Sequence, residues 1–398
     1  MSKPSSFFRR GSLVMAAIAI AGFGADYLLN LGLTRLLSNH EYGDYKVAHA
    51  FATLAGAVVL LGGDRAAPKA LAGPLTRHES APVWEYLWFY FRIALGLSAA
   101  IAAITWVGSF YHVGHADPTD HHPIAWVVVG IPILAAGALV SRTLQSGHHL
   151  VLANSPWRVA FPLTKLALIA VAAWMLGEMN VEGAIVLSLA AATLVVAWQW
   201  WKLRRLELSD FKRAPDIASP RAWLSVSLPM MGAFLIALAL AQSDLYFLEI
   251  LGEEDEVGRY AAAATTAHFL IILQAAIAGL FTPALQPALD QGLDAARVVY
   301  RQGQRLMLTW LIPVTVLLAV AARPALALFG PEYPTVTTEL RLLLLGYAAW
   351  ALAAMASMWL QYTGRGRSVL GISLLLLLVD SGLNFILIPR FGVMGAAA

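Results

Sequence analysis

The 398-residue chain contains no cysteine, which excludes disulfide bonds, thiol nucleophiles and cysteine-ligated metal centres. It also has little charge: Asp, Glu, Lys and Arg make up 13% of the residues, against roughly 25% in a soluble domain. Hydrophobic residues make up 59%, and the mean hydropathy is +0.68. A chain so poor in charge and so apolar is typical of a protein that lies mostly in lipid.

Long polar segments are scarce as well. The longest polar connection between apolar segments is 204–221, and the longest one expected on the other side of the membrane is 112–122. The sequence lacks a Gly-x-x-x-x-Gly-Lys-Ser/Thr loop, so we expect no ATP hydrolysis of that kind. A membrane-bound polymerase or glycosyltransferase would carry a long external loop with clustered polar residues. These absences favour a non-enzyme with no cofactor and no nucleic-acid partner.

Long apolar segments fill the rest of the chain. Each is long enough to cross a hydrocarbon core of ~30 Å as a helix, and continuous apolar segments exclude a transmembrane β-barrel. The start of a twelfth span at 394–398 leads us to expect that the chain ends inside a helix. The eleven predicted spans are 12–36, 46–62, 86–111, 123–146, 157–178, 182–203, 222–248, 259–287, 305–329, 339–363 and 368–388.

The second half of the sequence repeats the first. Residues 41–45 read Glu-Tyr-Gly-Asp-Tyr and residues 256–260 read Glu-Val-Gly-Arg-Tyr, 215 residues later; Asp26 returns as Asp244. We therefore predict an all-α polytopic membrane protein with an N-terminal lobe of six helices over 1–203, a linker over 204–221 and an incomplete C-terminal lobe over 222–398. Six spans per repeat give both lobes one orientation, related by a pseudo-two-fold axis along the membrane normal.

Basic residues set the predicted orientation. Most of the 27 Lys and Arg residues fall in one set of loops, including the linker, whereas the alternate loops are acidic or neutral, as at 253–256. Because cytoplasmic loops carry the excess of Lys and Arg, we expect a cytoplasmic N-terminus in a bacterial inner membrane. The high isoelectric point reflects this asymmetry rather than binding to nucleic acid.

Three segments resemble the polysaccharide-type flippases of the MOP (multidrug/oligosaccharidyl-lipid/polysaccharide) superfamily. Residues 31–72 are similar to the family's opening helix, Tyr-Gly-x-Tyr turn and second helix, with Leu37-Ser38 in place of Leu-Gly. Residues 243–264 are similar to its seventh helix and outward turn, and residues 383–398 to the junction of its last two helices. The resemblance spans nearly the whole chain.

The resemblance implies two six-helix lobes around a central cavity that opens alternately to each side. It implies a flippase that moves a polyprenyl-(pyro)phosphate-linked oligosaccharide to the periplasmic leaflet during polysaccharide or lipopolysaccharide biosynthesis. A polysaccharide polymerase and glycosyltransferases would be its protein partners. Two alternatives remain open: a cation-coupled exporter of small amphipathic molecules, and a non-catalytic assembly component of a polysaccharide pathway.

Charged residues inside spans are the candidates for function, because each costs at least ~2.5–3.5 kcal/mol in hydrocarbon. In the cytoplasmic half the charges are basic and suit an anionic headgroup. One alternative is that Arg92 snorkels to the lipid headgroups. Another is that Arg65 and Lys69 only anchor the cytoplasmic side of the protein, as the excess of basic residues in cytoplasmic loops does. The predicted substrate-binding residues are Lys165, Arg92, Arg158, Arg65 and Lys69.

The periplasmic half carries mainly acidic residues. Asp26 and Asp244 are repeat mates, and either could bind a coupling proton or cation, as a desolvated carboxylate can. Asp380 and Asn384 lie four apart on one helix face. The alternative is that these groups only join neighbouring helices. The predicted coupling or gating residues are Asp26, Asp244, Asp380 and Asn384.

Overall fold

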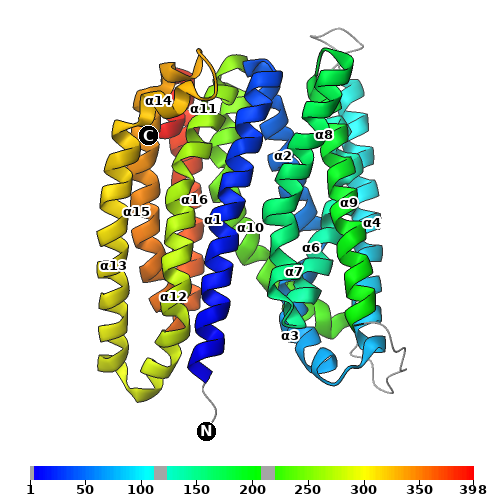
Figure 1. The fold of residues 1–398 in the computed structure, drawn as a ribbon, viewed down its shortest axis with the longest axis vertical. Helices are drawn as coiled ribbons and strands as arrows, with labels where there is room; N and C mark the ends of the chain where they lie inside the picture. The colour runs from blue at the N-terminus through cyan, green and yellow to red at the C-terminus, as the bar shows by residue number, and fades with distance from the viewer. Residues whose placement is uncertain (1–3, 112–122, 208–219) are drawn as a thin grey trace. The chain divides into compact units, whose positions relative to one another are not determined.

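The computed structural model describes residues 4–111, 123–207 and 220–398, and the regular structure in these segments is helical (Figure 1). The first half contains α1 (Pro4–Leu36), α2 (Asn39–Val59), α3 (Gly63–Thr76), α4 (Ser80–Tyr111), α5 (Ile124–Val127), η1 (Val128–Gly130), α6 (Ile131–Ser146), α7 (Leu150–Ser155), η2 (Pro156–Ala160), α8 (Phe161–Leu176) and α9 (Val181–Glu207). The second half contains α10 (Pro220–Leu251), α11 (Glu254–Ala267), α12 (Phe269–Gln291), α13 (Leu293–Val320), α14 (Ala322–Ala327), η3 (Tyr333–Val336), α15 (Thr337–Tyr362), α16 (Gly366–Phe391) and α17 (Val393–Ala397).

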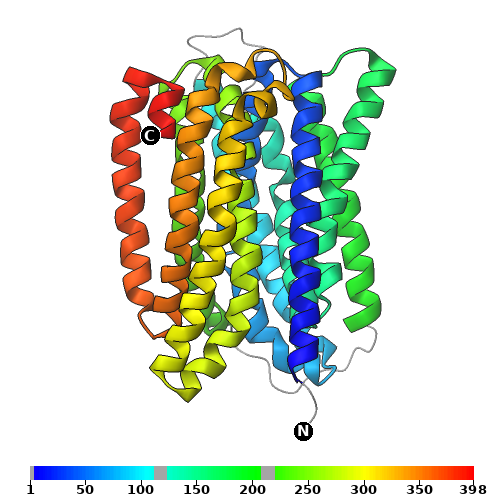
Figure 2. The same ribbon diagram turned by 60° about the vertical axis from the view of Figure 1, so that its left-hand side comes forward.

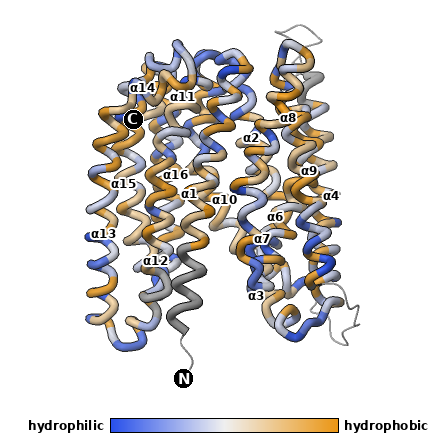
Figure 3. The backbone as a smooth tube through the Cα atoms, in the orientation of Figure 1, coloured by the Kyte–Doolittle hydropathy of each residue, from blue (hydrophilic) through white to orange (hydrophobic). Residues whose placement is uncertain are grey.

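The described residues contain ten helical segments long and apolar enough to span a membrane, and an eleventh if α2 and α3, bent by 47°, form one span. Hydrophobic residues run along the lengths of these helices, and hydrophilic residues gather at their ends (Figure 3). The start of α1 and the short α17 lie at opposite ends of the helices around them (Figures 1 and 2). The eleven predicted spans match the higher count, in which the bent pair is one span.

Contacts divide the chain into two compact units. Unit 1 contains residues 1–43 and 243–398, and unit 2 contains residues 44–242. The first helix therefore packs with the second half of the chain, while most of α10 packs with the first half. The predicted lobes follow the sequence repeat instead, and their boundaries stay a prediction. The linker residues 208–219 and the loop 112–122 lie outside the described residues.

The main apolar core of unit 2 lies among α3, α4, α6 and the end of α9. Tyr86 and Tyr90 are fully buried in it, and the Tyr86 hydroxyl donates a 2.6 Å hydrogen bond to the carbonyl oxygen of Gly63. Gly62 adopts the left-handed conformation, with φ of 76°, that turns the chain between α2 and α3. Residues 63–76, which were expected to form a loop with basic residues, instead continue as a helix.

Unit 1 is built on α12, α13 and α15, and α1 packs against α12 (Figure 2). The repeated turn motif also meets its own copy in this unit. A Cβ atom added to Gly43 would lie 2.9 Å from the backbone nitrogen of Gly258, and one added to Gly258 would overlap the carbonyl oxygen of Asn39. The two repeat-related glycines therefore allow the first turns of α2 and α11 to touch through their backbones.

Candidate functional site

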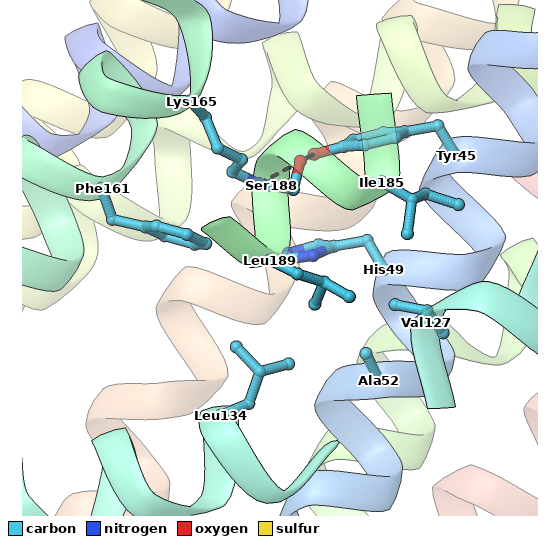
Figure 4. A pocket seen from close by; sticks show the side chains of 10 residues that line it. All are labelled: Tyr45, His49, Ala52, Val127, Leu134, Phe161, Lys165, Ile185, Ser188 and Leu189. Atoms are coloured by element: carbon cyan, nitrogen blue, oxygen red, sulfur yellow. Dashed lines mark hydrogen bonds between the residues drawn. The ribbon is translucent and has the colours of Figure 1, made fainter. Parts of the chain in front are cut away.

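A pocket opens inside unit 2, among helices α2, α5, α6, α8 and α9 (Figure 4). Its walls are mainly apolar, and its polar groups gather on one side, where Lys165 points toward Tyr45 and Ser188. His49 stacks parallel to the Tyr45 ring, with ring centroids 6.4 Å apart. The lining residues are Tyr45, His49, Ala52, Val127, Leu134, Phe161, Lys165, Ile185, Ser188 and Leu189.

Lys165 is the charged group of this pocket and is only 3% exposed. Its Nζ atom donates a 2.8 Å hydrogen bond to Tyr45 Oη, which lies 3.0 Å from Ser188 Oγ. The Ser188 hydroxyl donates to the carbonyl oxygen of Ala184 at 2.7 Å. Because that bond uses the only hydrogen on Ser188 Oγ, the Tyr45 hydroxyl must donate to Ser188, and the chain of donors begins at the lysine.

The positive charge of Lys165 has no carboxylate partner among the described residues. The ammonium instead lies 4.5 Å from the centre of the Phe161 ring and 5.4 Å from that of Tyr45. Such cation–π contacts contribute up to ~2 kcal/mol when desolvated, which is less than the several kcal/mol that burial of an ion costs. The pocket therefore has an unneutralised positive charge, as an anion-binding site requires.

A second group of charges lies on α3, on α6, which packs against it, and on the π-helix η2. Arg65 Nε lies 3.0 Å from Asp64 Oδ2, and the two side chains are 27% and 8% exposed. The Arg65 guanidinium also stacks on Phe234, 3.5 Å from the ring centre. Arg142 acts electrostatically on Asp64, Arg65 and Arg158. Arg65 and Arg142 act on the single carboxylate of Asp64, and Arg158 adds a third positive charge beside Arg142, so the group is net positive.

The structure does not bring all the predicted substrate-binding residues together. Arg92 lies on an exposed face of α4, 4.9 Å over the ring of Trp88, with the exposed Leu95 beside it. Lys69 is exposed on α3, and Arg158 is exposed on η2. Lys165 is thus the only one of the five that lines the pocket, and Arg65 and Arg158 belong to the net positive group.

The predicted acidic residues form two networks, both in unit 1. Asp244 accepts hydrogen bonds from Tyr260 Oη at 2.6 Å and from Asn384 Nδ2 at 2.9 Å. Asp380 accepts from Ser243 Oγ at 2.6 Å and from the same Asn384 amide at 3.3 Å. Neither carboxylate has an ion pair within the described part of the chain.

Asp26 lies in a similar network on α1. Its Oδ2 atom accepts a hydrogen bond from Asn30 Nδ2 at 3.2 Å, and Asn30 Oδ1 accepts from Tyr42 Oη at 2.9 Å. Asp26 itself is exposed, whereas Asn30 and Tyr42 are buried. Both repeat mates, Asp26 and Asp244, therefore combine a carboxylate with an asparagine amide and a tyrosine hydroxyl.

Tyr45 and Tyr260 were missed as site residues in the sequence. Each is the last residue of the repeated five-residue motif, and each hydroxyl bonds to an ionisable side chain inside a span. The repeat was the signal that could have found them. Ser188 and Arg142 had no comparable signal, because their roles come from contacts with distant segments.

Comparisons with known proteins identify a family and a shared fold. Residues 8–292 match the model of the family described as polysaccharide biosynthesis protein. No curated protein matches the sequence significantly. An inward-facing multidrug-resistance MATE transporter of the MOP superfamily superposes with a TM-score of 0.73 at 16% identity, covering 95% of this chain and 92% of the transporter.

Two further structures share the fold. A MOP superfamily transporter from Pyrococcus furiosus, described as having a binding pocket of reverse polarity, has a TM-score of 0.73 at 15% identity, with 98% and 91% of the two chains covered. The lipid II flippase MurJ, in an inward closed conformation, has a TM-score of 0.67 at 14% identity, with 99% and 84% covered. The chain therefore belongs to the polysaccharide biosynthesis protein family, and it has the fold shared by the transporters and flippases of the MOP superfamily.

Proposed function

We propose that the protein is a flippase that moves a polyprenyl-(pyro)phosphate-linked oligosaccharide from the cytoplasmic to the periplasmic leaflet of a bacterial inner membrane. The observation that carries this proposal is the buried, unneutralised ammonium of Lys165 inside a membrane-spanning unit. A positive charge held there at such a cost suits a substrate with negative charge. The family match to polysaccharide biosynthesis and the fold shared with a lipid II flippase support the same substrate class.

In this proposal each basic residue binds a different part of the substrate or of the membrane surface. Arg158 and Arg65, with Lys69 beside them, capture the pyrophosphate, because guanidinium groups bind phosphate oxygens in pairs. Lys165, two helical turns beyond Arg158, offers its charge to another anionic group of the substrate. Arg92 contributes at the membrane surface, where its exposed position over Trp88 favours contact with lipid headgroups.

The acidic networks serve coupling or gating in the same proposal. Asp244 and Asp380 share the Asn384 amide and lack basic partners among the described residues. A proton or cation that binds there and at Asp26 would change the balance between inward-open and outward-open forms, provided that it binds one form more tightly. This network also favours the second candidate function, a cation-coupled exporter of small amphipathic molecules.

Proteoliposomes containing the purified protein test the two functions side by side. We expect a fluorescent polyprenyl-pyrophosphate oligosaccharide to become accessible in the opposite leaflet at a rate that depends on the protein. Cationic dyes typical of multidrug exporters should not be moved at a comparable rate. Dye efflux without flipping of the lipid-linked sugar would overturn the flippase proposal and establish the exporter.

A further inference from the structure

Lys165 has few hydrogen-bond donors to offer a ligand, and this limits what can bind. The Tyr45 hydroxyl donates to Ser188, and the Ser188 hydroxyl donates to Ala184, so neither has a hydrogen left for a ligand. The donors that remain for a ligand are the two other N–H groups of the Lys165 ammonium and the ring N–H of His49, which also lines the pocket. A pyrophosphate has more oxygen atoms than these three donors can satisfy, and buried oxygens without partners are costly.

Apart from Tyr45, His49, Lys165 and Ser188, the pocket lining is apolar. Its walls come from Ala52, Val127, Leu134, Ile185 and Leu189, with the ring of Phe161 beside the ammonium. Such a wall suits a small anion that gives up its water readily, and not a strongly hydrated group with several charges. One ammonium also neutralises one negative charge and no more.

The sequence repeat gives an independent reason to expect an anion. Lys165 and Asp380 lie 215 residues apart, the same separation as between Tyr45 and Tyr260. In the second half Tyr260 donates its hydrogen to a carboxylate, that of Asp244, and Asp380 shares the Asn384 amide with it. In the first half Tyr45 accepts a hydrogen from an ammonium. Equivalent positions therefore carry opposite charges, and the ligand should have the opposite sign too.

We infer that the Lys165 pocket binds a small anion with one negative charge, of the size of chloride or a carboxylate group. The pyrophosphate of the proposed substrate is left to Arg158, Arg65 and Arg142. The anion has two possible sources: a chloride-like ion from solution, or a carboxylate on an acidic sugar of the glycan. The second source rests on the proposed function, whereas the site itself does not.

Thermal unfolding of the purified protein in detergent tests the site without any lipid-linked substrate. The 13 tryptophans report unfolding by intrinsic fluorescence, and sodium chloride, formate and gluconate are compared at equal ionic strength. Chloride or formate should raise the Tm of the wild type saturably by about 2–4 °C, and gluconate, which is too large for the pocket, should not.

Three variants locate the effect. Lys165→Met should lose the anion-dependent rise, and so should Ala52→Leu, which keeps the lysine and fills the pocket. Lys202→Met is the matched control, because Lys202 contacts only Trp198 and Trp201 among the rings described and lies away from the pocket; it should keep the rise. A wild type that responds equally to all three salts, or an unchanged rise in Lys165→Met, would overturn the inference.

The two sources are separated by the salts and by transport. A rise with chloride but not formate assigns the site to an ion from solution. A rise with formate, together with flipping of a carboxylate-bearing glycan that exceeds that of its neutral analogue in wild type but not in Lys165→Met, assigns it to the substrate. Because the unfolding measurement needs no transport, a protein that binds the anion and flips nothing would refute the proposed function alone.

Discussion

Lys165 and Asp380 show how one position of a repeat can carry either charge. Both lie inside spans, 215 residues apart, and each is tied to its unit through neutral hydroxyl or amide groups. Neutral partners leave the charge of each side chain intact, since hydrogen bonds alone do not cancel it. The charge therefore remains free to act on a ligand.

For a substrate whose glycan places a carboxylate on Lys165, replacement of this lysine by alanine should lower flipping about tenfold or more, because a hydrogen bond to a charged group contributes ~1.5–3 kcal/mol. The variant should still insert and fold, since it removes a buried charge. Flipping rates in proteoliposomes, set beside membrane expression levels, check this. Lys165→Arg should keep more activity than Lys165→Ala, and full activity in Lys165→Ala would remove the residue from the substrate path.

Neutralisation of the acidic networks should slow cycling without preventing substrate binding. Asp244→Asn and Asp26→Asn each remove a charge that a proton or cation could balance, so flipping should depend less on an ion or pH gradient. Flipping with and without a gradient, measured beside melting curves, distinguishes coupling from packing. A variant that only melts earlier would assign a structural role to its carboxylate, and unchanged gradient dependence in both would end the coupling proposal.

At the scale of the helices, the apolar segments of the sequence were sufficient to predict the spans. Bends within the helices were not predicted, because they depend on single residues held by neighbours. The turn at Gly62 needs a left-handed residue together with the Tyr86 bond to Gly63. The π-helix over Pro156–Ala160 interrupts the span between α7 and α8, and no periodicity of the apolar residues marks it. The sequence likewise identified Lys165 by depth and sign, but could not reveal Tyr45 or Ser188 as its neighbours.

The contact between the first turns of α2 and α11 depends on Gly258. A methyl group at this position would overlap the carbonyl oxygen of Asn39, which belongs to the backbone and cannot rotate away. Gly258→Ala should therefore destabilise the protein by ~1–3 kcal/mol, measured as a lower Tm in detergent.

The matched control is Gly279→Ala on α12, where an added Cβ would have no atom within 4 Å. Alanine there should be neutral or stabilising by up to ~0.5–1 kcal/mol, because glycine is a poor helix former. Equal Tm changes in the two variants would show that the close approach at Gly258 has no energetic consequence.

At the scale of the whole molecule, the predicted orientation can be measured directly because the chain has no cysteine. Arg221→Cys lies at the exposed start of α10 and Glu253→Cys at the exposed turn before α11. A membrane-impermeant maleimide should label Glu253→Cys in intact spheroplasts and label Arg221→Cys only after lysis. The reverse pattern would invert the topology and place the basic loops outside.

The grouping of α1 with the second half of the chain affects how the protein is made. Arg35 on α1 donates its hydrogen bond to the carbonyl oxygen of Leu328, 293 residues later. The ribosome must therefore synthesise all of unit 2 before α1 finds its partners on α11 and α12 and the carbonyl of Leu328. During that interval the first helix lacks its contacts with the second half of the chain, and a contact so distant in sequence is slow to form. Biogenesis should be most vulnerable there, to quality-control proteases that recognise an unpaired membrane helix.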